Sequence, residues 1–164
     1  MHQASLRFSM LITDKSTVIL DTCILIHFAN ADCFSILREL SGMEFITTQH
    51  VILEVTNKSQ LKKVNDCINS GLIRVARLAT PRIMEDYFSL CRRLGKGESS
   101  CIALASANNW IVCSDDKKRV PKTIKNRLGI NHLATTGDLL ETAVTQSIIS
   151  ETEKSEIQNR MNRH

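Results

Sequence analysis

The sequence predicts an α/β fold in which helices cover both faces of a parallel sheet. Five short apolar runs have the length of strands, and segments with helical spacing of apolar residues lie between them. Parallel neighbours need a crossover, usually a helix, so this alternation indicates a parallel sheet. The chain has 164 residues and no internal repeat or linker-like tract, which fits one domain. We expect an N-terminal extension over residues 1–16 and a domain over residues 17–164 that includes a C-terminal helix.

The strands are expected where the apolar runs are continuous. Four of the five runs lack strict polar alternation, which is typical of strands covered on both faces. The third run, LIRVARL, alternates apolar and polar residues and is therefore expected at an edge of the sheet. The predicted strands span residues 16–20, 44–48, 72–78, 110–114 and 130–134.

Capping residues set several of the expected helix ends. Thr48 is placed to cap a helix over residues 49–55, and Gly71 is placed to end a helix over residues 60–71. The remaining helical patterns cover residues 33–40, 81–95, 98–109, 119–129, 137–147 and 150–163.

The composition is that of a globular protein with a mild basic bias. Hydrophobic residues make up 43% and charged residues 23%, and the formal net charge of +4 is compatible with a polyanionic partner. The six cysteines form no C-x-x-C pair, which favours free thiols in a reducing cytosol over disulfides or a zinc site. No apolar run reaches the roughly 20 residues of a membrane span, and the N-terminus lacks signal-peptide features. We therefore expect a cytoplasmic protein without membrane association.

Acidic residues fall at the positions where a parallel α/β sheet binds ligands. Asp21 directly follows the first strand, and Asp115 and Asp116 directly follow the fourth. Glu54 lies in the helix after the second strand, and Glu98 lies at the start of the helix that leads into the fourth. Because ligands bind outside the carboxyl ends of such strands, we expect these acids to converge on one cleft.

A cluster of carboxylates indicates a metal site. Carboxylates repel one another unless a cation neutralises them, and all-oxygen ligand sets select hard cations such as Mg²⁺ or Mn²⁺. Such an ion polarises a phosphodiester and lowers the pKa of a bound water, which is the chemistry of nucleases.

Each acid has a simpler alternative when it is taken alone. Asp21 is equally well explained as a helix cap, and Glu54 as a solvated helix residue. Glu98 is explained by the positive end of its helix, and Asp115 and Asp116 by an ordinary turn. The metal-site hypothesis depends on all of them falling at the right topological positions together.

The motifs around these acids resemble a PIN domain. The resemblance rests on VILDTCILI, TTQHVILEV, GKGESSCIALA and IVCSDDKK, with TTGDLLE as a closing segment, and it covers about residues 17–145. It implies a three-layer α/β/α sandwich with a five-stranded parallel sheet, acidic metal ligands, and hydrolysis of phosphodiesters, usually in RNA. The chain departs from the family pattern at Cys23, where a small polar residue is common, and at Glu98, where aspartate is common. Neither departure removes a carboxylate.

The resemblance implies a role for each acid. Asp21 matches the family's first aspartate, Glu54 its second acid and Glu98 its third, while Ser114 and Asp116 match a closing Thr-x-Asp. The expected catalytic residues are Asp21, Glu54, Glu98 and Asp116, and the expected ligands of Mg²⁺ or Mn²⁺ are Asp21, Glu98, Asp115 and Asp116.

The two adjacent aspartates are expected to differ. Neighbouring residues that leave a strand point in opposite directions, so Asp115 and Asp116 do not face a metal equally. We expect Asp116 to lie nearer to it, with Ser114 capping the turn and orienting the Asp116 carboxylate. Asp115 is expected to reach the metal through water or to hold a nearby lysine.

Basic residues lie on both sides of the acidic motifs in the sequence. We expect them to rim the cleft and neutralise RNA phosphates, although a solvated helix face explains any single lysine equally well. They are Arg92, Arg93, Lys96, Lys117, Lys118, Arg119, Lys122, Lys125 and Arg127. The residues expected to contact RNA are Thr22, Lys96, Ser114, Lys117, Lys118 and Arg119.

These observations favour a metal-dependent endoribonuclease. Its resemblance to VapC-type toxins favours the toxin of a toxin–antitoxin pair, with RNA as substrate, an antitoxin protein as partner and a homodimer as a further assembly. The alternatives are an RNA-processing or DNA-directed nuclease of the same fold, and a catalytically idle nucleic-acid-binding module. An idle module gains nothing from repelling phosphates with four acids, which favours the enzyme.

Overall fold

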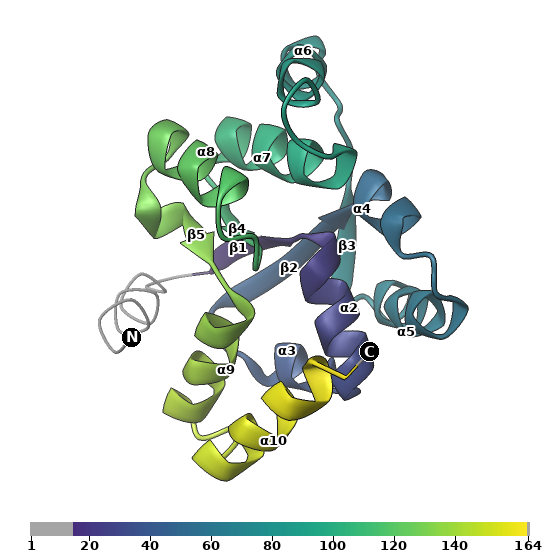
Figure 1. Cartoon of the computed structure of the whole chain (residues 1–164), viewed down its shortest axis with the longest axis vertical. Helices are drawn as coiled ribbons and strands as arrows, with labels where there is room; N and C mark the ends of the chain where they lie inside the picture. The colour runs from purple at the N-terminus through teal and green to yellow at the C-terminus, as the bar shows by residue number, and fades with distance from the viewer. Residues whose placement is uncertain (1–14, 164) are drawn as a thin grey trace.

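A five-stranded parallel sheet runs through the middle of the protein (Figure 1). The structure is a computed structural model that describes residues 15–163. Neighbouring strands pair in the order β3-β2-β1-β4-β5, and every pair is parallel. The prediction of a five-stranded parallel sheet is confirmed. The strands are β1 Ser16–Leu20, β2 Met43–Thr48, β3 Ile73–Ala76, β4 Ile111–Cys113 and β5 Leu133–Ala134.

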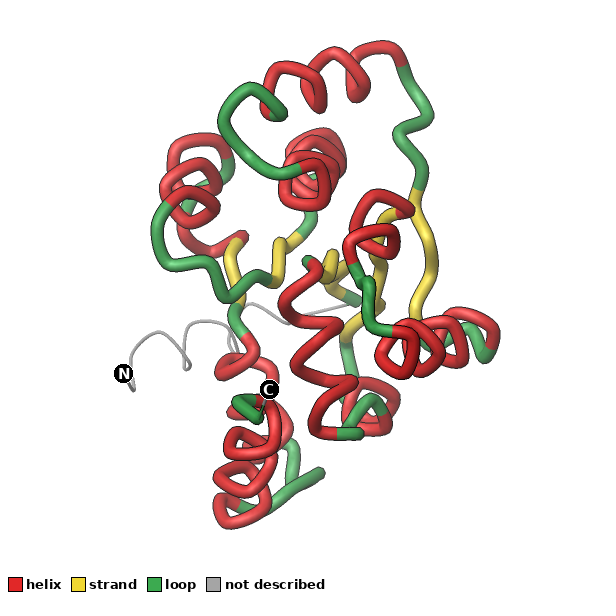
Figure 2. Tube along the Cα trace, turned by 45° about the vertical axis from the view of Figure 1, so that its right-hand side comes forward, coloured by secondary structure: helices red, strands yellow, loops and turns green. Residues whose placement is uncertain are grey.

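Helices cover both faces of the sheet and complete the three-layer α/β/α sandwich, as Figure 2 shows. One layer is centred on α7, against which α4, α6 and α8 pack. The other is centred on α2, against which α5 and α10 pack, and α9 packs on α10. The helices are α2 Thr22–Ala31, α3 Ser35–Glu39, α4 Gln49–Glu54, α5 Lys58–Asn69, α6 Pro81–Leu90, α7 Lys96–Asn108, α8 Arg119–Arg127, α9 Thr136–Thr145 and α10 Glu151–Met161.

The central and edge strands differ as their sequences predict. Val18, Ile19 and Leu20 of the central strand β1 have no exposed surface, because helices cover both faces there. Strand β3 lies at the edge, and its polar Arg74 is exposed and pairs with a β2 carboxylate, that of Glu44, at 3.0 Å. The expected edge position of this alternating strand is therefore confirmed.

The last two strands are shorter than predicted. The Trp110 N–H donates to the Ala105 carbonyl at 3.1 Å and closes the end of α7, so β4 begins only at Ile111. Residues Ile130–His132 form a 3₁₀ turn after Gly129, whose φ of 91° is in the left-handed region, so β5 keeps two residues.

Two helix starts were not anticipated. Helix α2 follows β1 directly, but its sequence TCILIHFANA is apolar nearly all round, which conceals the helical period. Helix α7 begins at Lys96, two residues before the expected start, which places Glu98 at its third position.

Residues 1–14 of the expected N-terminal extension lie outside the described residues, and its last residue, Ser16, is the first of β1. Within residues 15–163 no helix combines the length and the apolar character that crossing a membrane requires.

Candidate functional site: an acidic cleft at four helix starts

Each of the five predicted acids accepts a hydrogen bond from a backbone N–H at the start of a helix. In a parallel α/β sheet the helices after the strands begin at the carboxyl edge, so several starts meet there. The unpaired N–H groups and the positive end of the helix dipole favour anionic side chains. The pairs are Asp21 with α2, Glu54 and Glu98 with α7, Asp116 with α8, and Asp115 with α9.

These acids line one cleft of about 550 Å³. The prediction that they converge at the carboxyl edge of the sheet agrees with this arrangement. The complete lining is Asp21, Thr22, Cys23, Ile26, His27, Glu54, Gly95, Glu98, Asp115, Asp116 and Arg119.

Asp21 is the most buried acid of the cleft, with 4% of its surface exposed. Its Oδ1 accepts from the Thr22 N–H at 2.7 Å and its Oδ2 from the Ser114 hydroxyl at 2.9 Å. Burial raises the pKa of Asp21 to about 6; these two hydrogen bonds oppose the shift, and the negative charges of Glu98 and Glu54 add to it. Asp21 therefore carries a charge that its surroundings do not neutralise.

The start of α7 holds both glutamates. The Gly97 N–H donates to Glu54 Oε1 at 2.8 Å, and the Thr22 hydroxyl donates to Glu54 Oε2 at 2.6 Å. The Gly95 N–H donates to Glu98 Oε2 at 3.1 Å. A Cβ atom at position 97 would lie 2.6 Å from Glu54 Oε2, so a glycine is needed there for the carboxylate to reach the helix start.

Asp116 is held by the start of α8. Its Oδ2 accepts from the N–H groups of Lys118 at 3.0 Å and Val120 at 2.9 Å. Burial acts to raise the pKa of Asp116, but the backbone hydrogen bonds outweigh it and the net shift is downward. Asp116 is therefore ionised in the usual pH range.

Ser114 caps the turn as expected, but it orients a different carboxylate from the one expected. Its hydroxyl donates to Asp21 and accepts from the Asp116 N–H at 3.3 Å, so it orients the Asp21 carboxylate and not the carboxylate of Asp116. Ser114 has no exposed surface, so its expected contact with RNA is wrong: a fully buried hydroxyl does not reach a bound chain.

Asp115 faces a different set of neighbours. Its Oδ1 accepts from the Thr136 N–H at 2.8 Å, and its Oδ2 lies 2.6 Å from the Thr136 hydroxyl and 2.7 Å from Nδ1 of His27. Burial acts to raise the pKa of Asp115, but the hydrogen bonds from His27 and Thr136 outweigh it and lower the pKa. Asp115 holds a histidine, where contact with the metal through water or with a nearby lysine was expected.

Residues 17–164 match a protein-family model described as DUF3368, PIN domain. The chain belongs to the PIN-domain family. No curated protein and no solved structure shows a significant match. The PIN domain is a nuclease-type fold, and PIN domains typically bind divalent metal ions.

The donor groups of this PIN domain fit a hard divalent cation. The carboxylates offer only oxygen, and burial followed by the Asp21 charge raises the pKa of the Cys23 thiol to about 11, so no thiolate competes. Burial, with a smaller contribution from the charges of Glu98 and Glu54, raises the pKa of Asp21, and a bound cation would favour its ionised form. Within residues 15–163 no three histidine, cysteine, aspartate or glutamate side chains are already grouped closely enough to enclose a metal ion. Asp21, Glu98 and Asp116 could hold one, with Glu54 beside them.

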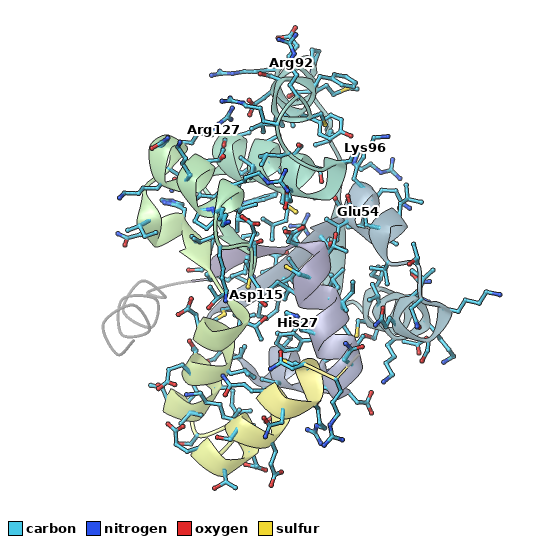
Figure 3. The ribbon with its side chains drawn as sticks, in the orientation of Figure 1. His27, Glu54, Arg92, Lys96, Asp115 and Arg127 are labelled. Atoms are coloured by element: carbon cyan, nitrogen blue, oxygen red, sulfur yellow. The ribbon has the colours of Figure 1, made fainter. Side chains whose placement is uncertain are left out.

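The basic rim is smaller than predicted. Arg119 and Thr22 line the cleft, whereas Lys96, Lys117 and Lys118 are exposed but are not part of its lining. Figure 3 shows Arg92 at the far end of the α6 region, away from Asp115. Arg127 is paired with Asp86 at 2.8 Å in another hollow. The expectation that all the basic residues rim the cleft is therefore wrong.

A larger hollow of about 740 Å³ lies between α6, α7 and α8. Its Asp86 carboxylate accepts two hydrogen bonds from the Arg127 guanidinium, at 2.9 and 2.8 Å, and is thereby neutralised. Although this hollow is larger than the acidic cleft, it is not the better candidate for the functional site, because the carboxylates without a neutralising partner lie in the acidic cleft.

His27 and Thr136 are site residues that the sequence did not predict. A signal for His27 was present: if Asp21 caps a helix, then residues 23 and 27 lie one turn apart on one face. Thr136 gave no such signal, because its contact with Asp115 crosses 21 residues of sequence.

Proposed function

We propose that this protein is a metal-dependent endoribonuclease that hydrolyses RNA phosphodiester bonds. One observation carries the proposal: Asp21 is buried at the floor of a cleft with Glu54 and Glu98, and its pKa is raised to about 6 by burial and by their charges. Strongly perturbed acids in a cleft mark functional sites, and a PIN domain is a nuclease-type fold.

The proposed ligands of Mg²⁺ or Mn²⁺ are Asp21, Glu98 and Asp116, with Glu54 completing the catalytic set. When bound, the ion supplies Lewis-acid polarisation of the phosphodiester and a bound water of lowered pKa. We assign Asp115, first expected among the ligands, to a supporting place because three protein donors hold it and lower its pKa. Asp21 accepts only two hydrogen bonds from such donors, and its pKa stays raised.

Other residues of the cleft support this chemistry. Ser114 and the Thr22 N–H hold the two Asp21 oxygens in a fixed orientation. Arg119 is the cationic residue of the cleft lining, and it is placed to neutralise a phosphate next to the scissile bond. Lys117 and Lys118 are exposed on the same turn and add a weaker, longer-range attraction for a polyanion.

The test is cleavage of labelled RNA and of DNA with the same base sequence. We expect the wild-type protein to cut RNA with Mg²⁺ or Mn²⁺ and to lose activity in excess chelator. The Asp21→Asn variant, purified identically, controls for contaminating nucleases because it keeps the shape of the side chain and removes the charge. Undiminished cleavage by wild type in chelator contradicts the metal mechanism, and preferential cleavage of DNA supports the DNA-directed alternative.

The biological role proposed with this activity is the toxin of a toxin–antitoxin pair, on the basis of the resemblance to VapC-type toxins. Induced expression of the wild-type chain in bacteria is expected to slow growth, whereas Asp21→Asn is expected not to. Co-expression of a neighbouring antitoxin gene product should restore growth. Equal growth of both strains counts against the toxin role and leaves the nuclease to be judged by the cleavage assay.

A further inference from the structure

His27 lies in the acidic cleft although it is not an acid. It is placed on α2, one helical turn after Cys23, and 29% of its side chain is exposed. Figure 3 shows it beside Asp115. The His27 Nδ1 lies 2.7 Å from Asp115 Oδ2, which is the distance of a strong hydrogen bond.

The carboxylate that holds His27 is itself fixed. Thr136 binds both Asp115 oxygens through its N–H and its hydroxyl, at 2.8 and 2.6 Å. Three separate segments thus meet at one point: α2, the end of β4 and the start of α9. An ionised carboxylate only accepts hydrogen bonds, so Nδ1 of His27 carries the proton. This contact sets both the orientation and the tautomer of the ring, as a carboxylate behind a histidine commonly does.

The opposite ring nitrogen is left for a ligand. Nε2 of His27 has no hydrogen-bond partner among residues 15–163 and is not enclosed by them, while the ring lines the cleft. In a neutral ring with its proton on Nδ1, Nε2 is an acceptor only. A hydrogen-bonding partner for Nε2 in this neutral ring is therefore a donor that enters the acidic cleft.

The nucleic-acid backbone offers one such donor. Phosphate oxygens are acceptors, whereas the ribose 2′-hydroxyl donates, occurs at every nucleotide of RNA and is missing from DNA. Hydrolysis by water does not consume the 2′-hydroxyl, so contact with it affects recognition and not the chemical step.

We infer that His27 is a specificity-determining residue whose Nε2 accepts a hydrogen bond from a ribose 2′-hydroxyl near the scissile bond, so that the cleft distinguishes RNA from DNA. This inference rests on the proposed nuclease function and assigns its substrate preference to one side chain.

Two substitutions separate the two ring nitrogens. His27→Asn keeps an amide nitrogen close to the Nδ1 position, where it still donates to Asp115, and it removes Nε2. His27→Gln extends a carbonyl oxygen toward the Nε2 position and gives up the Asp115 contact. A matched control is His132→Gln, because His132 precedes β5 and lies at the opposite, amino edge of the sheet.

The experiment is a scan of single 2′-deoxy substitutions through an RNA oligonucleotide around its mapped cleavage site. We expect one position at which the deoxy change lowers wild-type kcat/KM by about tenfold, as for the loss of one hydrogen bond. His27→Asn should cleave the all-ribose substrate more slowly and show no penalty at that position. His27→Gln should restore part of the penalty, and His132→Gln should behave as wild type.

Binding gives a second measurement that does not depend on turnover. Fluorescence anisotropy in chelator should show that wild type binds the all-ribose oligonucleotide more tightly than the one with the critical deoxy position, and that His27→Asn binds both equally. Circular-dichroism melting of each variant checks the fold.

Three outcomes overturn the inference. One is the same penalty profile in wild type and His27→Asn. Another is no position-specific penalty and no binding difference in wild type. The third is a loss in His27→Asn that is equal for RNA and DNA, which indicates a phosphate contact. Absence of metal-dependent cleavage by wild type is a separate result: it contradicts the proposed function, and the binding comparison then decides the His27 contact.

Discussion

Asp21 and Asp115 share one cleft at the ends of neighbouring strands, but their surroundings are opposite. Asp21 is buried beside Glu54 and Glu98, and burial together with these charges raises its pKa to about 6. Asp115 is also partly buried, but hydrogen bonds from Thr136 and His27 lower its pKa.

The difference separates a carboxylate whose charge is not compensated by its hydrogen bonds from one whose charge is. A buried charge among like charges destabilises the folded protein, and such an arrangement is typical of sites that bind a cation or perform chemistry. A carboxylate whose hydrogen bonds outweigh the cost of its burial stabilises the fold and orients its neighbours. In this PIN domain the first kind is the proposed metal site and the second supports it.

The largest expected effect comes from the first kind. Asp21→Asn keeps a side chain that caps α2 but removes the central charge, so we expect kcat for RNA cleavage to fall by about a thousandfold. Asp115→Asn should lower it by clearly less, because Asp115 acts through His27. The measurement is single-turnover cleavage at saturating Mg²⁺. If Asp115→Asn proves the more damaging change, the roles assigned to the two carboxylates are reversed.

Asp116 provides a comparison within the adjacent pair. Among the described residues, the backbone N–H groups that hold Asp116 donate only to its Oδ2 and not to its Oδ1. As a proposed metal ligand, Asp116 should matter for the rate, so Asp116→Asn is expected to lower the cleavage rate by roughly a hundredfold. The titration of activity against Mg²⁺ should shift to higher concentration for this variant and not for Asp115→Asn. Identical Mg²⁺ dependence in both variants would count against Asp116 as a ligand.

A smaller effect is expected from the glycines at the start of α7. In Gly97→Ala the new Cβ meets the Glu54 carboxylate at 2.6 Å, so Glu54 must leave the helix start, and we expect activity to fall about tenfold. Stability should change by less than about 1 kcal/mol, since a flexible side chain moves and alanine favours the helix. Gly95→Ala is the matched control: its nearest contact is 3.8 Å, so its activity should stay close to wild type. Equal losses in both variants would indicate that α7 itself has been disturbed.

The smallest expected effects are changes in the free energy of unfolding, and they have opposite signs for Asp21→Asn and Asp115→Asn. The pKa of Asp21 is raised in the folded state from an ordinary 3.8, so its protonation stabilises the fold; this stabilisation is complete below about pH 3.8 and is lost as pH rises through 6. Asp21→Asn should therefore raise the metal-free free energy of unfolding at pH 7.5 by about 1–3 kcal/mol. The gain should shrink at pH 4.5, where Asp21 is already protonated.

Asp115 should behave in the opposite way. Its pKa is lowered, so its contribution to stability is present above the ordinary 3.8 and is lost as pH falls below that value. Asp115→Asn should lower the free energy of unfolding at pH 7.5 by about 1–2 kcal/mol, because an amide does not accept all three hydrogen bonds. Urea unfolding in chelator at both pH values measures the two variants side by side. Destabilisation by Asp21→Asn would show that the surroundings of Asp21 compensate its negative charge in the wild-type protein.

By itself the sequence determined the sheet, most of the helices and the acids at its carboxyl edge. The reason is local: continuous apolar runs specify strands covered on both faces, and Asp21 and Asp115 follow those runs directly. The motif resemblance to PIN domains came from the same short segments, and the family match over residues 17–164 bears it out.

Only the tertiary structure decided what each acid meets. The contact of Asp115 with His27 joins residues 88 apart in sequence, and that of Thr22 with Glu54 joins residues 32 apart. No periodicity encodes such pairs, because they arise from the order of the strands and the way α2, α7 and α9 begin at one edge. The same geometry buried Ser114 behind Asp21, so its hydroxyl orients that carboxylate and does not reach the surface.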